Sequence, residues 1–181
     1  MYISRELRKK NIAEYVLYMW QVEDLLRAYG CSLPVIRREY IAKFDIDDEQ
    51  KDEMADWYGN LIRMMNDEGC RQKGHLAINK IVVEELDELN DKLIAASDKY
   101  PFYRNEYYKV LPFIVELRKK GAPKDETEVE TCLNALYGTM LLRLQKREIS
   151  PDTRYAMREI TTFIGMLSDY YTKYKDGSLE L

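Results

Sequence analysis

The sequence contains few of the residues that interrupt helices. Only 8 glycines and 5 prolines occur among 181 residues, so long stretches lack the two residue types that most disfavour a helix interior. No stretch alternates apolar and polar residues with the period of a strand, and no Asn-Gly or Asp-Gly pair lies between strand-like runs. These absences predict an all-α protein.

Long apolar runs are also missing. No window of about 18 residues is both apolar and uncharged, which disfavours a membrane-spanning helix. The first residues, MYISRELRKKNIAEY, carry charges where a secretion signal needs an apolar centre. The three cysteines, Cys31, Cys70 and Cys132, are widely spaced and form no Cys-x-x-Cys pair. This usage is typical of a reducing compartment, so we expect a cytoplasmic protein with no membrane contact.

The chain has one histidine, His75, and this excludes several kinds of metal site. Di-iron bundles need a Glu-x-x-His motif on each of two helices, and structural zinc sites need clustered Cys and His. The acidic run DIDDEQKDEMAD lacks the glycine and the terminal glutamate of a calcium loop. We therefore expect no metal and no cofactor, and we identify no catalytic residue. His75 itself is interpreted as an ordinary loop residue.

The charge balance disfavours a nucleic-acid partner. The net charge is -4 and the sequence pI is about 5.3. Short basic clusters occur, but two of them fall in the last turns of predicted helices, where cations complement the helix dipole. A nucleic-acid-binding regulator remains only a third alternative.

Apolar residues recur with a helical period along most of the chain. This pattern predicts a single domain over residues 1–181, built as an antiparallel bundle of about six helices, with a flexible tail at about 176–181. A further short helix after Ser32 can serve as a lid or brace. The main helices are expected over residues 4–29, 48–65, 78–94, 101–120, 129–144 and 151–176.

Local patterns predict how some of these helices begin and continue. Two capping boxes are expected, one from Asp47 with Gln50 and one from Asp125 with Glu128. Pro112 lies inside the helix predicted over residues 101–120. Because proline removes a backbone hydrogen bond and clashes with the preceding turn, we expect a kink or a break there.

The most informative stretch is YVLYMWQVEDLLRAYG, which Gly30 ends. Its helix is apolar on most sides, as in a central helix of a bundle, and Glu23 projects beside the main apolar face. This carboxylate is either solvated at the margin or buried and paired. If it is buried, we expect an arginine partner, Arg143 or Arg158. Tyr18 and Trp20 would then form the aromatic walls of a small ligand pocket, or the ion pair would be purely structural.

Fifteen tyrosines are the one unusual feature of the composition. Two groups, YPFYRNEYY and DYYTKY, gather many of them. Tyrosine is enriched at protein interfaces, so these groups predict a homodimer. The candidate interface residues are Tyr103, Tyr107, Tyr108, Tyr170, Tyr171 and Tyr174.

The segments RELRKKNIA and EYVLYMWQVEDLLRAYG together resemble the N-terminal signature of an uncharacterised bacterial family, described as a domain of unknown function. The resemblance implies an all-helical protein with no assigned activity and provides no catalytic residues. The leading interpretation is a non-enzymatic cytosolic binding or interaction module. The alternative is a small-ligand-binding protein or enzyme with a pocket near Tyr18, Trp20 and Glu23.

Overall fold

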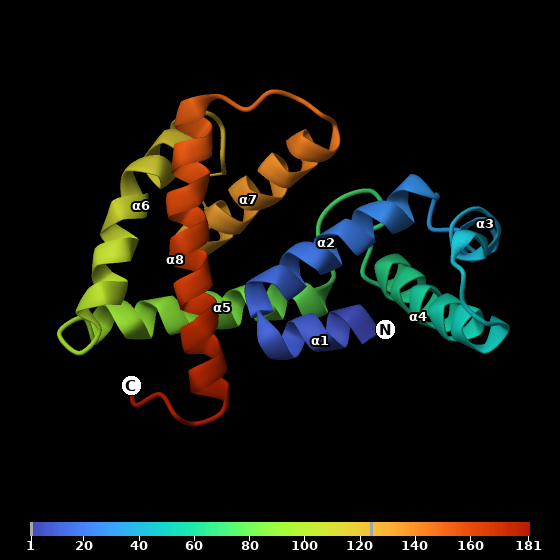
Figure 1. Ribbon diagram of the computed structural model, residues 1–181, viewed down its shortest axis with the longest axis horizontal. Helices are drawn as coiled ribbons and strands as arrows, with labels where there is room; N and C mark the ends of the chain where they lie inside the picture. The colour runs from blue at the N-terminus through green and yellow to red at the C-terminus, as the bar shows by residue number, and fades with distance from the viewer. Residues whose placement is uncertain (1, 124) are drawn as a thin grey trace. The chain divides into compact units, whose positions relative to one another are not determined.

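The computed structural model describes residues 2–123 and 125–181. These residues form eight α-helices and one short 3-10 helix, and no strand occurs among them (Figure 1). The all-α prediction is confirmed, but the helices outnumber the predicted six. The elements are α1 (Tyr2–Lys10), α2 (Ile12–Ala28), α3 (Leu33–Glu39), η1 (Ile41–Lys43), α4 (Asp48–Asp67), α5 (Ala77–Ala95), α6 (Pro101–Lys119), α7 (Glu128–Leu144) and α8 (Pro151–Lys175).

The first predicted helix is two helices, α1 and α2, which are separated at Asn11. The interruption is stabilised by Ser168 of α8. The Ser168 hydroxyl accepts a hydrogen bond from the Ile12 N–H at 3.1 Å and donates one to Asn11 Oδ1 at 2.9 Å. A side chain thus supplies the partner for a backbone group that the helix start leaves unpaired. The apolar period continues across Asn11, so it gives no sign of the interruption.

The chain divides into two compact units. Unit 1 contains the chain up to Arg8 together with Glu14–Ile81, and unit 2 contains Lys9–Ala13 together with Val82–Leu181. Unit 1 therefore includes α3, η1 and α4, with most of α1 and α2 and the first residues of α5. Unit 2 includes α6, α7 and α8 with the remainder of α5.

In unit 1, α3 and η1 pack against α4 (Figure 1). The capping box predicted for α4 is present: Asp47 accepts from the Gln50 N–H, and the Gln50 side chain accepts from the Asp47 N–H. It satisfies two backbone donors at the start of the helix. The apolar core of this unit is formed by residues spaced three and four apart on α2 and α4, including Val16, Met19, Leu26, Met54, Tyr58, Leu61 and Met65.

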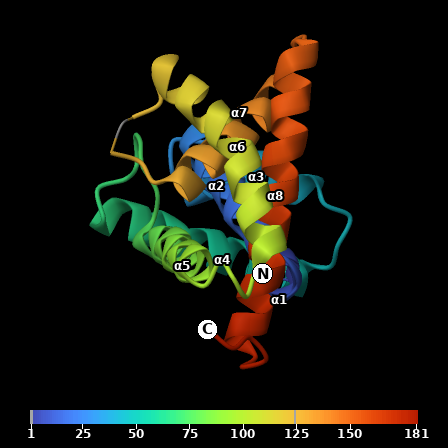
Figure 2. The same ribbon diagram turned by 90° about the vertical axis from the view of Figure 1, so that its left-hand side faces the viewer.

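In unit 2, α8 packs against both α6 and α7, and Figure 2 shows α6 and α8 side by side. Helix α6 does not break at Pro112, since the helix continues from Pro101 to Lys119. Pro112 is exposed, so any carbonyl that it leaves without a partner can bind water. The buried residues of the unit include Leu86, Leu89, Tyr103, Val110, Ile114, Cys132, Leu133, Ile160, Phe163 and Leu167.

The start of α7 differs from the prediction. The N-cap is Thr127, whose hydroxyl accepts from the Glu130 N–H at 3.1 Å. The capping box predicted from Asp125 and Glu128 is therefore wrong. Thr127 is held by a further contact, because its hydroxyl donates to Asp87 of α5 at 2.6 Å. The local sequence is also compatible with this cap, because Thr127 and Glu130 have the Thr-x-x-Glu spacing of a helix start.

The apolar face of α7 is only partly buried. Val129, Cys132 and Leu133 in its first turns are buried, whereas Leu136 and Leu141 are half-buried. Within the described part of the chain, no helix combines the length and the apolarity that crossing a bilayer requires.

Candidate functional site

Glu23 of α2 is fully buried in unit 1, with no part of its side chain exposed to solvent. Its carboxylate is nevertheless well satisfied. Oε1 accepts from the backbone N–H of Leu76 at 2.9 Å and from the side-chain amide of Asn79 at 2.7 Å. Oε2 lies 2.6 Å from Nδ1 of His75. A buried carboxylate is tolerated when its lone pairs are hydrogen-bonded in this way.

The start of α5 provides a second reason why Glu23 can be buried. Leu76 is the residue before α5, so its N–H is one of the donors that a helix start leaves without a partner. Glu68 plays the same role next to it, accepting from the Ala77 N–H at 2.6 Å. The positive end of the α5 dipole therefore faces the carboxyl groups of Glu23 and Glu68, which is an attractive arrangement.

His75 is more than the ordinary loop residue that the sequence suggested. Its ring stacks on Trp20, with centroids 4.3 Å apart and planes inclined by 19°, and the side chain is 28% exposed. Glu23 on one edge and Trp20 on one face fix the imidazole. Among the described residues, the hydrogen bonds of His75 involve Glu23 alone. No hydroxyl or thiol is therefore hydrogen-bonded to His75 as in a nucleophilic dyad.

Two arginine side chains also connect the loop that carries His75 to α2 and its C-terminal turn through hydrogen bonds to backbone carbonyls. Arg27 donates to the carbonyls of Cys70 and Gly74, the first at 3.1 Å, and pairs with Asp24 at 2.8 Å. Arg71 of the loop donates back to the Gly30 carbonyl at 2.9 Å. Together with the hydrogen bonds of Glu23 to His75, Leu76 and Asn79, these contacts hold the loop that follows α4 against α2. We call this set of contacts the Glu23 latch.

The buried thiol of this loop is not activated. Burial raises the pKa of the Cys70 thiol, and the nearby Glu23 and Glu68 carboxylates raise it further. Cysteine nucleophiles need the opposite shift. Among the described residues, no three His, Cys, Asp or Glu side chains gather as they would around a metal ion.

The predicted arginine partners of Glu23 are wrong. Arg143 and Arg158 belong to unit 2 and are exposed; the Arg158 guanidinium lies over the Tyr155 ring at 5.2 Å. The backbone N–H, the amide and the imidazole already occupy both oxygens of Glu23, so no guanidinium is needed. Of the five predicted ligand residues, the structure thus brings Glu23 and Trp20 together around His75.

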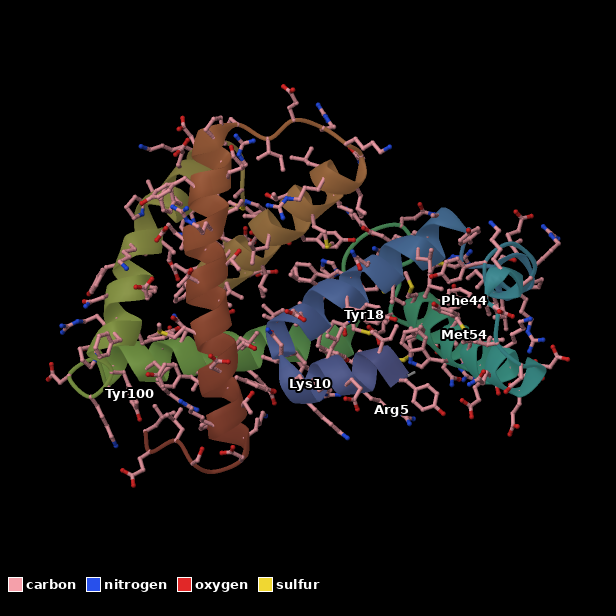
Figure 3. All side chains as sticks on the ribbon, in the orientation of Figure 1. Arg5, Lys10, Tyr18, Phe44, Met54 and Tyr100 are labelled. Carbon is pink, nitrogen blue, oxygen red and sulfur yellow. The ribbon has the colours of Figure 1, made fainter. Side chains whose placement is uncertain are left out.

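Tyr18, which Figure 3 labels, lies elsewhere in unit 1, near the Tyr40 hydroxyl. Tyr40 meets Phe44 and Tyr58 edge to face, with centroids 5.2 and 6.0 Å apart. Burial raises the pKa of Tyr18, and the neighbouring Tyr40 hydroxyl adds to this. Burial also raises the pKa of Tyr58, with Tyr40 and Tyr18 adding to it. Tyr58 is a buried core residue, whereas Tyr18 and Tyr40 are half-buried and Phe44 is 39% exposed, so these rings lie at the edge of the core.

The predicted interface tyrosines separate into two kinds. Tyr103 is fully buried and its hydroxyl donates to Asn90 at 2.7 Å. Tyr171 is 7% exposed and donates to Glu85. Both are core residues of unit 2, so neither can lie on a free surface. Tyr107 and Tyr170 are half-buried, while Tyr108 and Tyr174 are 56% and 39% exposed.

A groove of about 470 Å³ lies between α1 and α4 in unit 1, and we name it the α1–α4 groove. Figure 3 labels one residue from each side, Arg5 of α1 and Met54 of α4. Tyr2 on the α1 side is 65% exposed, and Trp57 on the α4 side is half-buried. The complete lining is Tyr2, Arg5, Ile46, Gln50, Glu53, Met54, Asp56, Trp57 and Asn60.

The apolar pattern of the sequence does not predict this groove. Met54 and Trp57 fit the apolar period of α4, so the pattern predicted them as core, and the acidic run was explained as a helix start. The groove exists because α1 stands opposite this face of α4. The one available sign was a tryptophan preceded by two acidic residues, Glu53 and Asp56.

The fold and the site together define an all-helical protein with the Glu23 latch, in which a buried glutamate contacts a histidine, and with a separate surface groove. A family model described as Domain of unknown function (DUF4924) matches residues 1–178, so the chain belongs to this family. This confirms the resemblance seen in the N-terminal residues. Comparisons with curated proteins and with solved structures gave no significant match.

Proposed function

We propose that the protein is a non-enzymatic binding module and that the α1–α4 groove is its binding site. The observation that carries this proposal is the groove itself. It is a concave surface of about 470 Å³ that combines one exposed and one half-buried aromatic ring with charged side chains of both signs. Sites for small ligands have volumes of roughly 300–1,000 Å³ and combine apolar walls with a few polar groups.

The residues around Glu23 support a structural role rather than a second binding site. Its carboxylate accepts from three donors, and Trp20, which is 2% exposed, is covered on one face by His75. A ligand at Glu23 would have to displace contacts that hold the loop and the start of α5. Among the described residues, nothing places a nucleophile in hydrogen-bond reach of His75. These points favour binding over catalysis.

We also propose a cytoplasmic protein that can self-associate. Three thiols that form no disulfide support a reducing compartment, and the exposed rings of Tyr108 and Tyr174 support a contact between copies. Size-exclusion chromatography with light scattering tests the second point, because a monomer mass at all concentrations would refute it.

The binding function is tested by a thermal-shift screen against a library of small polar and amphipathic compounds. A compound that binds the folded protein at ten times its Kd stabilises it by about 1.4 kcal/mol, which raises Tm by about 3–6 °C. Replacing Asn60 with Tyr adds a ring to the lining of the groove, and Asp67→Tyr adds a ring to an exposed part of α4 outside it.

Compounds that bind the groove should stabilise the wild type and Asp67→Tyr but not Asn60→Tyr. A library without stabilising compounds, or stabilisation that Asn60→Tyr retains in full, would contradict the proposed site.

A further inference from the structure

We infer that the α1–α4 groove takes a zwitterionic ligand that combines an ammonium group, a carboxylate and an apolar body, as in an apolar amino acid or a short peptide with free ends. This inference rests on the proposed function and specifies its ligand. It follows from the charges on the two sides of the groove and from the rings between them.

The α4 side offers carboxylates for an ammonium group. Glu53 and Asp56 line the groove and are exposed, and neither has an ion pair among the described residues. Their neighbour Asp52 is different, because it pairs with Arg37 at 2.8 Å. The acidic run that starts at Asp45 surrounds them with further negative charge, which attracts a cation toward this side.

The α1 side offers a guanidinium for a carboxylate. Arg5 lines the groove, is exposed, and has no ion pair in the described part of the chain. Arginine presents parallel N–H donors that match the two oxygens of a carboxylate, and such bidentate bonds are among the stronger polar contacts in proteins. Arg5 and the two carboxylates come from different helices, so the groove has opposite charges on its two sides.

The groove is also lined by apolar side chains. Ile46, Met54 and Trp57 line it from the α4 side and Tyr2 from the α1 side. A purely anionic ligand would be repelled by Glu53 and Asp56, and a purely cationic ligand would be repelled by Arg5. Only a ligand that carries both charges satisfies both sides while its body covers the rings.

The test is isothermal titration with L-phenylalanine and with the dipeptide Leu-Phe, each beside its N-acetylated and its C-amidated form. We expect the free zwitterion to bind and each single cap to weaken binding at least about tenfold. Stronger binding of the dipeptide than of the amino acid would identify a peptide end as the ligand, and the reverse order would identify a free amino acid.

Variants assign each charge to its side of the groove. In Arg5→Gln, amidation of the ligand should no longer weaken binding, and in the double variant Glu53→Gln, Asp56→Asn, acetylation should no longer weaken it. Arg38→Gln and Glu49→Gln remove exposed charges outside the lining and should behave as wild type. Equal affinity for free and capped forms would overturn the inference.

The same experiment separates two kinds of failure. If capped forms bind as well as free ones and Asn60→Tyr abolishes both, the groove is a binding site but the ligand class is wrong. If library compounds bind the groove but no amino acid or dipeptide does, the ligand class is again wrong. If neither set of compounds binds there, the proposed function is wrong as well.

Discussion

The Nδ1 atom of His75 lies 2.6 Å from a carboxylate oxygen of Glu23, although the two residues are 52 positions apart in the chain. Glu23 is fully buried and His75 is 28% exposed, so the pair connects the interior of unit 1 to its surface. The same carboxylate holds the start of α5 through Leu76 and Asn79. The pair is therefore the centre of the latch that fixes the loop after α4.

Replacing Glu23 with Gln should destabilise the protein by about 2 kcal/mol, because hydrogen bonds to a charged group become neutral ones. The corresponding fall in Tm is about 4–8 °C. Thermal unfolding followed by circular dichroism measures it. Glu84→Gln makes the same change at an exposed position of α5 and should leave Tm nearly unchanged. Equal effects of the two substitutions would show that the carboxylate at position 23 has no special role.

Replacing His75 with Ala should uncover one face of the Trp20 ring, which is stacked on the imidazole at 4.3 Å. In a Trp57→Phe background, Trp20 is the only tryptophan, so its fluorescence can be read alone. We expect emission at longer wavelength and stronger quenching by acrylamide than with His75 in place. Unchanged emission and quenching would mean that other groups cover the ring.

The cap of α7 can be tested by two neighbouring substitutions. Thr127→Ala removes both the bond from the Glu130 N–H and the bond to Asp87, and should cost about 1–2 kcal/mol. Asp125→Ala removes the residue that the local pattern predicts as the cap and should have little effect. Urea unfolding of both variants measures the difference. A larger loss of stability for Asp125→Ala than for Thr127→Ala would favour the predicted capping box over the Thr127 cap.

Asp87 makes the stability of the protein depend on pH. Burial is the main cause that raises the pKa of Asp87 to about 6, and the nearby Glu130 and Asp91 carboxylates add to it. A carboxyl whose pKa is higher in the folded state binds its proton more tightly there. Its contribution to stability therefore grows as pH falls from about 7 toward 4 and is absent above the folded pKa.

Asp87→Asn removes this dependence and keeps an oxygen that can accept from Thr127. At pH 7.5 the variant should be more stable than the wild type by about 1 kcal/mol, a value reduced for partial solvent screening. At pH 5 the difference should shrink. Denaturant unfolding at both pH values measures it, and a constant difference would mean that Asp87 does not titrate in this range.

Features set by local sequence could be predicted, and features set by distant contacts could not. The helical class follows from the apolar period and the scarcity of glycine and proline, and the Asp47 capping box follows from residues three apart. The interruption at Asn11 depends on Ser168, which is 157 residues away. The apolar period placed Glu23 beside the buried face of its helix, but nothing near it in sequence identifies His75 as its partner.

The α1–α4 groove is a second feature that depends on contacts between distant parts of the chain. The period of α4 correctly groups Met54 with Trp57, since both lie on one face of the helix. Only the position of α1 turns part of that face into a groove instead of closed core. Arg5 can be proposed as a ligand-binding residue only when the helix that lies opposite it is known.

The proposed function is tested most directly by the side-chain indole N–H signals of the two tryptophans in an ¹H–¹⁵N NMR titration. Trp57 lines the groove and Trp20 is buried against His75, so the two signals report on different places, and Trp57→Phe assigns them. With a ligand that raises Tm, we expect a saturable shift of the Trp57 signal, an unmoved Trp20 signal and no shift in Asn60→Tyr. A shift of Trp20 with Trp57 unmoved would place binding at the Glu23 latch and contradict the account.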